Sequence, residues 1–280
     1  MSRIEEALKK AARHRDQTRK PDVGAVEAAP VKPVAAPPRV EKQNEGGEAL
    51  LAVEPLRPSS GLVVTTLTER TPAAEEFNKL RAAVVALTRG EPFLNTLLVT
   101  SGISEEGKSM TALNLAVSLA KEQDHTVLLV DTDLRRPSLH HYLGISPDKG
   151  LVHCLRDNVP ISEVLVKTGI GKLVFLPAGE ALKDPLDLIS SQRMRDIIAE
   201  LKKRYPERYV IFDSPPALPF ADAGVLADMV DSTLIVVREG RAAKEDVRRL
   251  VENFKEHHLL GAVYNDTHSF SKKQGYYYYY

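Results

Sequence analysis

The stretch that decides the fold is "LLVTSGISEEGKSMTALNLA", residues 97–116. Its centre, Gly102–Ser109, matches the pattern G-x-x-x-x-G-K-[ST], with an apolar strand before it and a helical pattern after it. The two glycines let the backbone curl so that its N–H groups point inward, and the following helix adds partial positive charge at its N-terminus. The stretch therefore predicts a loop between a strand and a helix that binds phosphate groups.

Side chains that suit nucleotide chemistry lie in this loop and after two further strands. Lys108 can reach the β- and γ-phosphates of a nucleotide, and the Ser109 hydroxyl can ligate Mg²⁺. Asp131 and Asp133 end the strand in "LLVDTDLRRP", and Asp213 ends the strand in "YVIFDSPP". Each carboxylate alone could simply cap the following turn. Because open α/β sheets bind ligands at the carboxyl ends of their strands, the three together predict ligands for Mg²⁺ and water.

Residues 61–268 alternate apolar strands with helical segments. This alternation predicts an α/β fold, a three-layer sandwich whose mainly parallel central sheet is covered by helices on both faces. Residues 61–68 are β-rich, and residues 185–205 have the pattern of one long amphipathic helix. The other strands are expected within residues 93–101, 125–133, 172–179, 208–216, 232–240 and 259–266.

The chain outside this domain divides into three further parts. In residues 1–20, an apolar stripe predicts a short amphipathic helix, which either docks on a partner or an anionic leaflet or stays solvated and partly frayed. Residues 21–60 are rich in proline and alanine and have no periodicity, so they predict a disordered linker. Residues 269–280 are expected to form a flexible tail that ends in tyrosines.

Composition excludes several classes of function. The 38 Lys and Arg residues balance 38 Asp and Glu residues, which argues against a general nucleic-acid partner. Cys154 is the single cysteine, so no intrachain disulfide forms, and its surroundings predict a small core residue. The start of the chain is too polar for a secretory signal, and no stretch approaches the about 18 apolar residues of a membrane span.

Residues 61–280 resemble the bacterial tyrosine kinases, or BY-kinases, of capsule and exopolysaccharide export, which belong to the MinD/ParA-like P-loop superfamily. The resemblance is carried by "TSGISEEGKSMTALNLA" as Walker A, "VLLVDTDLRRP" as Walker A′, "VIFDSPP" as Walker B, "DPLDLISS", and the last strand "LLGAVYND". The opening "MSRIEEALKKAAR" and the proline-rich linker are similar to the stand-alone autokinases of PEP-CTERM/exosortase exopolysaccharide loci.

This resemblance implies ATP and Mg²⁺ as cofactors and assigns roles to particular residues. The implied nucleotide-binding residues are Gly102, Glu106, Gly107, Lys108, Ser109, Met110 and Asn265, the last at the position that binds the base. The implied magnesium ligands are Ser109, Asp133 and Asp213. Lys108, Asp131, Asp133, Asp213 and Arg135 form the implied catalytic set, with Asp131 as the base. Arg135 either steadies the transferred charge or binds a neighbouring subunit.

The chain ends in "SKKQGYYYYY", with five tyrosines at Tyr276, Tyr277, Tyr278, Tyr279 and Tyr280. By the same resemblance, these tyrosines are the phosphoacceptors of an autokinase. Each phosphorylation adds about −1.5 to −2 charges, so five would bring about −8 to −10 onto one segment, enough for neighbouring tails to repel one another. The alternative is a sticky, low-complexity end without a substrate role.

Two positions depart from the family pattern. The assembly motif E-x-x-R-x-x-R is present here as Glu75, Asn78 and Arg81, so its middle arginine is missing and ring contacts are in question. Related partitioning ATPases often have a lysine just after the first glycine of the loop, where this chain has Ile103. The second departure favours a kinase over a MinD/ParA-like ATPase switch.

The resemblance also implies partners and a place in the cell. The expected partners are further copies of the chain, which phosphorylate one another, a separate membrane chain-length or co-polymerase activator, and a tyrosine phosphatase. The protein is then cytoplasmic and recruited peripherally to the inner face of the membrane, where it regulates exopolysaccharide polymerisation and export. Two rival functions stay open, a positional ATPase switch and a non-catalytic scaffold that binds ATP and a membrane protein.

Overall fold

The computed structural model describes residues 56, 58, 61, 63–66, 71–204 and 207–267. The predictions for residues 1–20 and the tyrosine tail lie outside the described residues, as does that for residues 21–60 except at positions 56 and 58. The division of the chain into four parts therefore stays a prediction.

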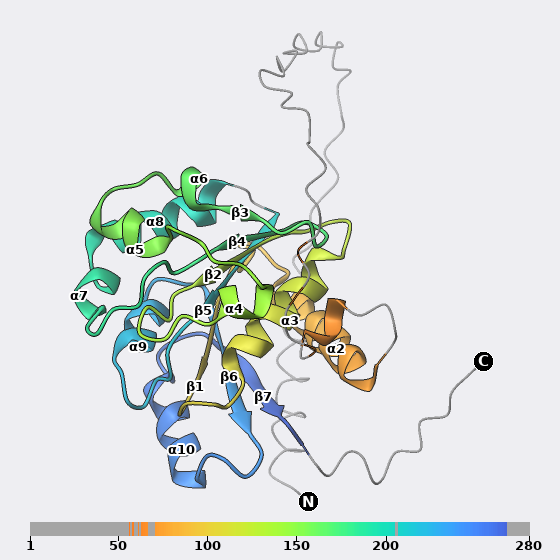
Figure 1. Ribbon diagram of the computed structural model, residues 1–280. Coiled ribbons are helices and arrows are strands. Elements are labelled where there is room, and N and C mark those ends of the chain that lie inside the picture. Colours follow the sequence, from red (N-terminus) through yellow and green to blue (C-terminus); the bar gives the residue numbers. More distant parts are fainter. Residues whose placement is uncertain are drawn as a thin grey trace, which may run out of the picture. The chain divides into compact units, whose positions relative to one another are not determined.

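The described part is built on a seven-stranded sheet with the strand order β3-β4-β2-β5-β1-β6-β7 (Figure 1). The strands are β1 (Thr96–Ser101), β2 (Thr126–Asp131), β3 (Val166–Lys167), β4 (Leu173–Leu176), β5 (Arg208–Asp213), β6 (Ser232–Arg238) and β7 (Leu259–Asn265). All neighbouring strands are parallel except β3, which pairs antiparallel with β4. The predicted mainly parallel sheet is confirmed.

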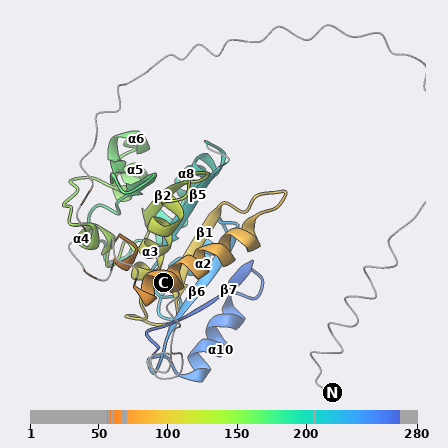
Figure 2. The ribbon, with the colours of Figure 1, turned by 90° about the vertical axis from the view of Figure 1, so that its right-hand side faces the viewer.

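Helices cover both faces of this sheet. They are α2 (Pro72–Thr88), α3 (Lys108–Ala120), α4 (Leu139–Leu143), α5 (Leu151–Arg156), α6 (Ile161–Val164), α7 (Leu186–Ile189), α8 (Gln192–Arg204), α9 (Asp222–Ala227) and α10 (Lys244–Asn253). Figure 1 shows α2, α3 and α4 on one side of the sheet and α5, α7, α8 and α9 on the other, and in Figure 2 α2 lies in front of the strands. No helix among these is long and apolar enough to cross a membrane.

The strands supply two cores because successive side chains point to opposite faces. In β1, Leu98 packs with the cluster that holds α5, α8, α9 and α10, whereas Leu97 and Val99 pack with the cluster under α2, α3 and α4. All of β1 is buried, as expected for a central parallel strand covered on both sides. This burial fixes the end of β1, where the glycine loop begins.

Two local predictions are wrong. The β-rich segment at 61–68 contains a 3₁₀ helix (η1, Val64–Thr66), because Thr65 bonds through its N–H and its hydroxyl to the Asn114 side chain of α3 rather than to a strand. The single helix expected over 185–205 is broken into α7 and α8. At the break, the Ser191 hydroxyl accepts the N–H of Met194 at 3.2 Å, as a helix cap does.

Cys154 lies in the core under α5 and is fully buried, as expected. Burial raises the pKa of its thiol, and the thiolate is the reactive form. We expect the native protein to react with a thiol-specific disulfide reagent at pH 8 at least about a hundredfold more slowly than the same chain in denaturant, because reaction requires an opening of the core. A fast stoichiometric reaction of the native protein would contradict this placement.

Candidate active site

The glycine loop runs from the end of β1 to the start of α3 at Lys108, where Gly107 is the N-cap. Gly107 has φ +89°, a left-handed conformation that side chains with a Cβ rarely adopt. A Cβ built there would lie 2.2 Å from Nδ2 of Asn265. The predicted loop is thus present between the predicted strand and helix, and the end of β7 lies directly against it.

Glu106 holds the loop from inside rather than facing a ligand. Its side chain is fully buried, and its two carboxylate oxygens accept the N–H of Ile103 at 2.8 Å and the N–H of Arg238 at 3.3 Å. The Asn265 amide donates to the Glu106 carbonyl oxygen at 2.9 Å. The Glu106 side chain therefore positions the loop. Of this residue, only the backbone N–H is left to bind a phosphate group.

Lys108 joins the loop to the acidic strand ends. Its Nζ lies 2.9 Å from Asp133 Oδ2 and 3.8 Å from Asp213 Oδ1, and it donates to the Ser109 hydroxyl at 3.1 Å. Burial disfavours the charged amine, but the attraction of Asp213 and Asp133 outweighs it, so the pKa of Lys108 is raised. The amine therefore stays a cation at neutral pH.

Asp131 ends β2 directly beside Asp213 of β5, to which it is paired in register. It is fully buried, with Oδ1 accepting the N–H of Asp133 and Oδ2 accepting those of Ser138 and Leu139, each at 3.2 Å. Burial and the nearby charges of Asp213 and Asp133 raise the pKa of Asp131 well above its usual range. The predicted base thus lies one layer behind the pocket wall formed by Ser138.

Asp213 is equally buried, and burial raises its pKa to about 6 although Lys108 and Ser109 pull it down. Neither carboxylate oxygen has a hydrogen-bond partner of normal geometry among the described residues. Ser109 therefore lowers the pKa of Asp213 as a nearby hydroxyl and not through a formed hydrogen bond. Two buried carboxylate oxygens that accept no hydrogen bond, beside a serine hydroxyl, suit a hydrated cation such as Mg²⁺.

No three acidic, histidine or cysteine side chains converge on one point within the described part of the chain. The three carboxylates expected as metal and water ligands share one sheet edge but do not form a metal-binding cluster by themselves. This arrangement is compatible with Mg²⁺, which is usually bound through one or two carboxylates together with the phosphates of the substrate.

Arg135 is engaged inside the chain. Its Nε donates to Asp222 Oδ2 at 3.1 Å, its guanidinium also donates to the Lys183 carbonyl at 3.0 Å, and it stacks 4.3 Å above the ring of Phe220. Asp222 is fully buried at the start of α9. Within the chain, Arg135 thus ties the A′ segment to Asp222 of α9 and to Phe220 of the pocket wall.

These groups surround a pocket of about 360 Å³. Its wall contains the predicted Gly107, Lys108, Ser109, Met110, Asp133 and Arg135, together with Ser104, Glu105, Arg136, Ser138, Tyr142, Pro216, Pro219 and Phe220. The other predicted site residues, Gly102, Glu106, Asp131, Asp213 and Asn265, are not part of this wall. Sequence reasoning missed Tyr142 and Phe220 because they belong to no phosphate motif. Ser104 and Glu105 lie inside the glycine motif itself, and Pro216 lies three residues after Asp213, so the motifs gave a signal for these.

Two residues of the altered assembly motif on α2, Asn78 and Arg81, contact α3. Asn78 donates to Glu75 and accepts from the Ser118 hydroxyl, while Arg81 donates to the Ser118 carbonyl and pairs with Glu122 at 3.1 Å. These contacts lie within one chain. An asparagine in place of the middle arginine therefore joins an internal network between the two helices.

Comparisons with known proteins agree with this geometry. A family model described as an AAA domain matches residues 104–262. Tyrosine-protein kinase YwqD of Bacillus subtilis is 34% identical over 188 residues, which cover 66% of this chain and 78% of YwqD.

Two solved structures have the same fold. The kinase domain of the Escherichia coli tyrosine kinase ETK matches with a TM-score of 0.68 at 26% identity, over 78% of this chain and 84% of that domain. The chimerical protein CapA2B2 matches with a TM-score of 0.67 at 25% identity, over 76% of this chain and 94% of that one. The P-loop, the paired acidic strand ends and these relatives point to one family. The chain belongs to the BY-kinases of the capsule and exopolysaccharide family, which are protein-tyrosine kinases of the MinD/ParA P-loop superfamily.

Proposed function

We propose that this kinase phosphorylates its own C-terminal cluster, Tyr276–Tyr280, with ATP as the donor. The observation that carries the proposal is the position of Asn265, which ends β7 and bonds to the P-loop. The described chain therefore ends, at Thr267, two residues beyond a contact with the P-loop. Tyr276 follows Asn265 by eleven residues, a separation that a flexible chain spans as roughly 17–20 Å.

In this proposal the P-loop holds the phosphates of ATP. Inward N–H groups of Gly102–Gly107 and the N-terminus of α3 attract the anionic oxygens, and Lys108 leaves its carboxylate partners to contact the β- and γ-phosphates. Met110 lines the pocket. Asn265 remains the proposed contact for the base, through the part of its amide that does not bond to Glu106.

Mg²⁺ fits beside Ser109, Asp133 and Asp213, and when bound it would neutralise charge on the phosphates. Ser109 is the proposed direct ligand. The Asp213 oxygens, which lack hydrogen-bond partners, and the pocket-lining Asp133 would hold water molecules in the coordination shell.

The transfer itself breaks the bond between the γ-phosphorus and the β,γ-bridging oxygen and forms a bond from that phosphorus to the tyrosine oxygen, so ADP leaves. A phenol has a pKa of about 10 and must lose its proton as the bond forms. We assign this proton to Asp131, because burial and the neighbouring carboxylates raise its pKa and so make its carboxylate a stronger base. The tyrosine would replace the N–H donors of Ser138 and Leu139 at Oδ2.

The wider role follows from the family. We propose that the protein acts on the cytoplasmic side of the membrane, where a separate membrane chain-length or co-polymerase activator recruits it, and that a tyrosine phosphatase resets the tail. The chimera CapA2B2, which has this fold, supports pairing with such an activator. Phosphorylation of the tail would then regulate exopolysaccharide or capsule polymerisation and export.

The test is the intact mass of the purified chain after incubation with ATP and Mg²⁺, followed by peptide mapping. Phosphate on Tyr276–Tyr280 is the expected result. ATP hydrolysis without phosphotyrosine would replace the proposal by an ATPase switch, and ATP binding without any turnover would replace it by a scaffold.

We further expect phosphorylation to pass between chains. A tail that curls back over its own nucleotide gives up more conformational freedom than one that reaches a facing copy. Mixing a chain inactivated by Lys108→Met with an active chain that lacks residues 269–280 should label the inactive chain. An unlabelled inactive chain, together with a wild-type rate per molecule that does not change on dilution, would show transfer within one chain instead.

A further inference from the structure

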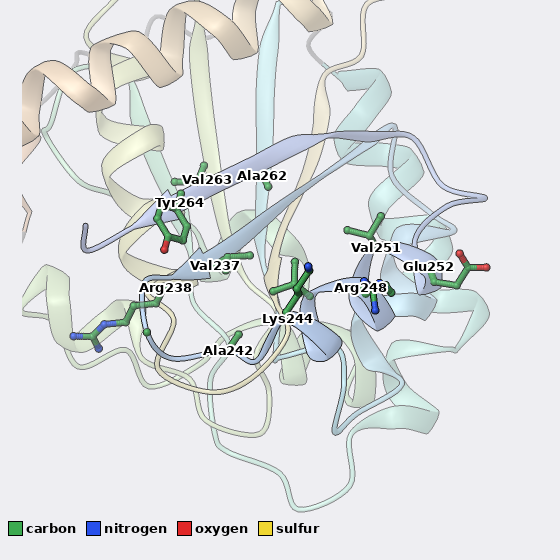
Figure 3. Close-up of a pocket in the computed structure, with 12 residues that line it drawn as sticks. Val237, Arg238, Ala242, Lys244, Arg248, Val251, Glu252, Ala262, Val263 and Tyr264 are labelled. Carbon is green, nitrogen blue, oxygen red and sulfur yellow. The ribbon is translucent and has the colours of Figure 1, made fainter. Parts of the chain in front are cut away.

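A second cavity, of about 660 Å³, lies away from the active site between α10 and the strands β6 and β7 (Figure 3). We call it the α10–β7 groove. The lining residues that matter below are Arg238, Lys244, Arg248, Val251, Glu252 and Tyr264. The groove follows β7, the edge strand of the sheet, which leads into the C-terminal tail.

Part of the groove is apolar and exposed. The side chains of Tyr264 and Val251 are 59% and 43% exposed, although both are large and hydrophobic. Figure 3 shows Val263 and Tyr264 on β7 and Val251 on the facing helix α10. A surface of this kind suits a ligand with a flat apolar part such as an aromatic ring.

The groove is also cationic. Lys244 and Arg248 are four residues apart on α10, both line the groove, and neither takes part in an ion pair among the described residues. The acidic lining residue, Glu252, is already paired with Lys255 at 2.5 Å. Arg238 pairs with Asp266, just beyond the end of β7. Two unpaired cations beside an apolar floor suit an anionic group attached to an aromatic ring.

We propose that the α10–β7 groove binds the phosphorylated C-terminal tail, with one phosphotyrosine ring against Val251, another against Tyr264, and phosphate groups beside Lys244 and Arg248. The inference rests on the proposed autophosphorylation for the origin of the ligand. Phosphate oxygens are strong acceptors for guanidinium and ammonium groups, and the aromatic ring adds apolar contact.

The length of the chain beyond the described residues permits this contact. Tyr276 follows Thr267, the last described residue, by nine residues, and Tyr280 follows it by thirteen. Nine residues of flexible chain span roughly 15–18 Å, and α10 with its ten residues is about 15 Å long. The tyrosines can therefore reach along the groove, which includes Tyr264, three residues before the end of the described chain.

Charge complementarity depends on phosphorylation. The unmodified tail carries Lys272 and Lys273 and no acidic residue after Asp266, so Lys244 and Arg248 repel it. Five phosphotyrosines would add about −8 to −10 charges and reverse the sign. The groove therefore favours the product of the reaction over its substrate, and a docked tail is withdrawn from the active site of a neighbouring chain.

The test uses the full chain with Lys108→Met, so that its own tail stays unmodified. The probe is a fluorescent synthetic peptide of residues 272–280 with all five tyrosines phosphorylated, and anisotropy gives its affinity. We expect Lys244→Glu with Arg248→Glu to weaken binding by about tenfold or more, since both contacts become repulsive. The matched control is Arg249→Glu, an exposed position on α10 outside the groove lining, which should change affinity by less than about twofold.

Each outcome decides the proposal separately from the kinase activity, because the peptide is phosphorylated chemically. Equal binding to both variants, or equal binding of the unphosphorylated peptide, would overturn it. So would binding of phosphatidylglycerol vesicles through Lys244 and Arg248 without binding of the peptide, which would make the groove a membrane contact. Dimerisation through β7 that excludes the peptide would make it an interface between copies. Thermal melting of the double variant and the weaker pair Lys244→Gln, Arg248→Gln guard against loss of folding.

Discussion

Replacing Lys108 with methionine is expected to lower the initial rate of autophosphorylation by about a hundredfold to a thousandfold or more. Lys108 is the single cation that contacts both Asp133 and Asp213 within the described chain, and it is the group that can transfer from them to the phosphates. Phosphoryl transfer depends chiefly on positioning and charge stabilisation, so a neutral side chain of similar length removes the main contribution. Incorporation of labelled phosphate from ATP measures the effect.

The same substitution leaves buried carboxylates without their counter-charge, so folding has to be checked. We expect the melting temperature to change modestly and the far-UV spectrum to be unchanged, because protonation of Asp213, whose pKa is already about 6, relieves the uncompensated charge. The matched control is Lys203→Met, an exposed lysine on α8. A Lys108→Met chain that is phosphorylated at nearly the wild-type rate when alone would show that the P-loop pocket is not the kinase site.

The second large effect is expected at Gly107. Alanine in a left-handed conformation costs about 1–2 kcal/mol, or about a five- to thirtyfold loss of the loop conformation that binds phosphate. The new methyl group would also lie 2.2 Å from the Asn265 amide, which must move away from Glu106. We therefore expect Gly107→Ala to weaken binding of a non-hydrolysable ATP analogue by more than about thirtyfold, measured by calorimetry, because the clash adds to the backbone cost.

Gly102 supplies the matched control, since it is the other glycine of the same motif. A Cβ there meets Leu250, Glu106 and Leu218 at 3.4–3.5 Å, which is ordinary contact. Gly102→Ala should therefore weaken nucleotide binding far less. In a chain that already has Asn265→Ala, and so lacks both the clash and the proposed base contact, Gly107→Ala should weaken binding only by the backbone part, about five- to thirtyfold. If the two glycine variants bind equally well, the distinction made by the structure is wrong.

The sequence determined the layers of this protein and the edge at which its chemistry lies. Short apolar runs such as those of β1 and β5 predict strands from neighbouring residues alone. The carboxyl ends of parallel strands then meet at one edge of the sheet, whatever the order of the strands. The amino-acid sequence alone was therefore enough to place Asp131 and Asp213 together, and they are neighbours in register. The glycine loop was equally local, because strand, turn and helix follow one another directly in the chain.

Local patterns failed at two places, once because of a distant contact and once because of a local helix cap. Residues 61–68 have strand character, but Thr65 bonds to Asn114, 49 residues away, and a 3₁₀ turn results. The helix expected over 185–205 has continuous apolar periodicity, yet the Ser191 cap ends one helix and starts another. Neither hydrogen bond changes the spacing of apolar residues, so the apolar periodicity of these segments does not reveal it.

Only the tertiary structure decided which predicted site residues face a ligand and which support it. Glu106 and Lys108 stand two positions apart in one motif, but the first turns inward to the backbone of Arg238 and the second outward to Asp133. Arg135 is directed by Asp222, 87 residues later, rather than by its own motif. The α10–β7 groove likewise exists because α10 packs beside the last strand. A sequence fixes side-chain types and local spacing, whereas burial and partner choice depend on segments that meet only after folding, which is why the roles within the site came from the fold.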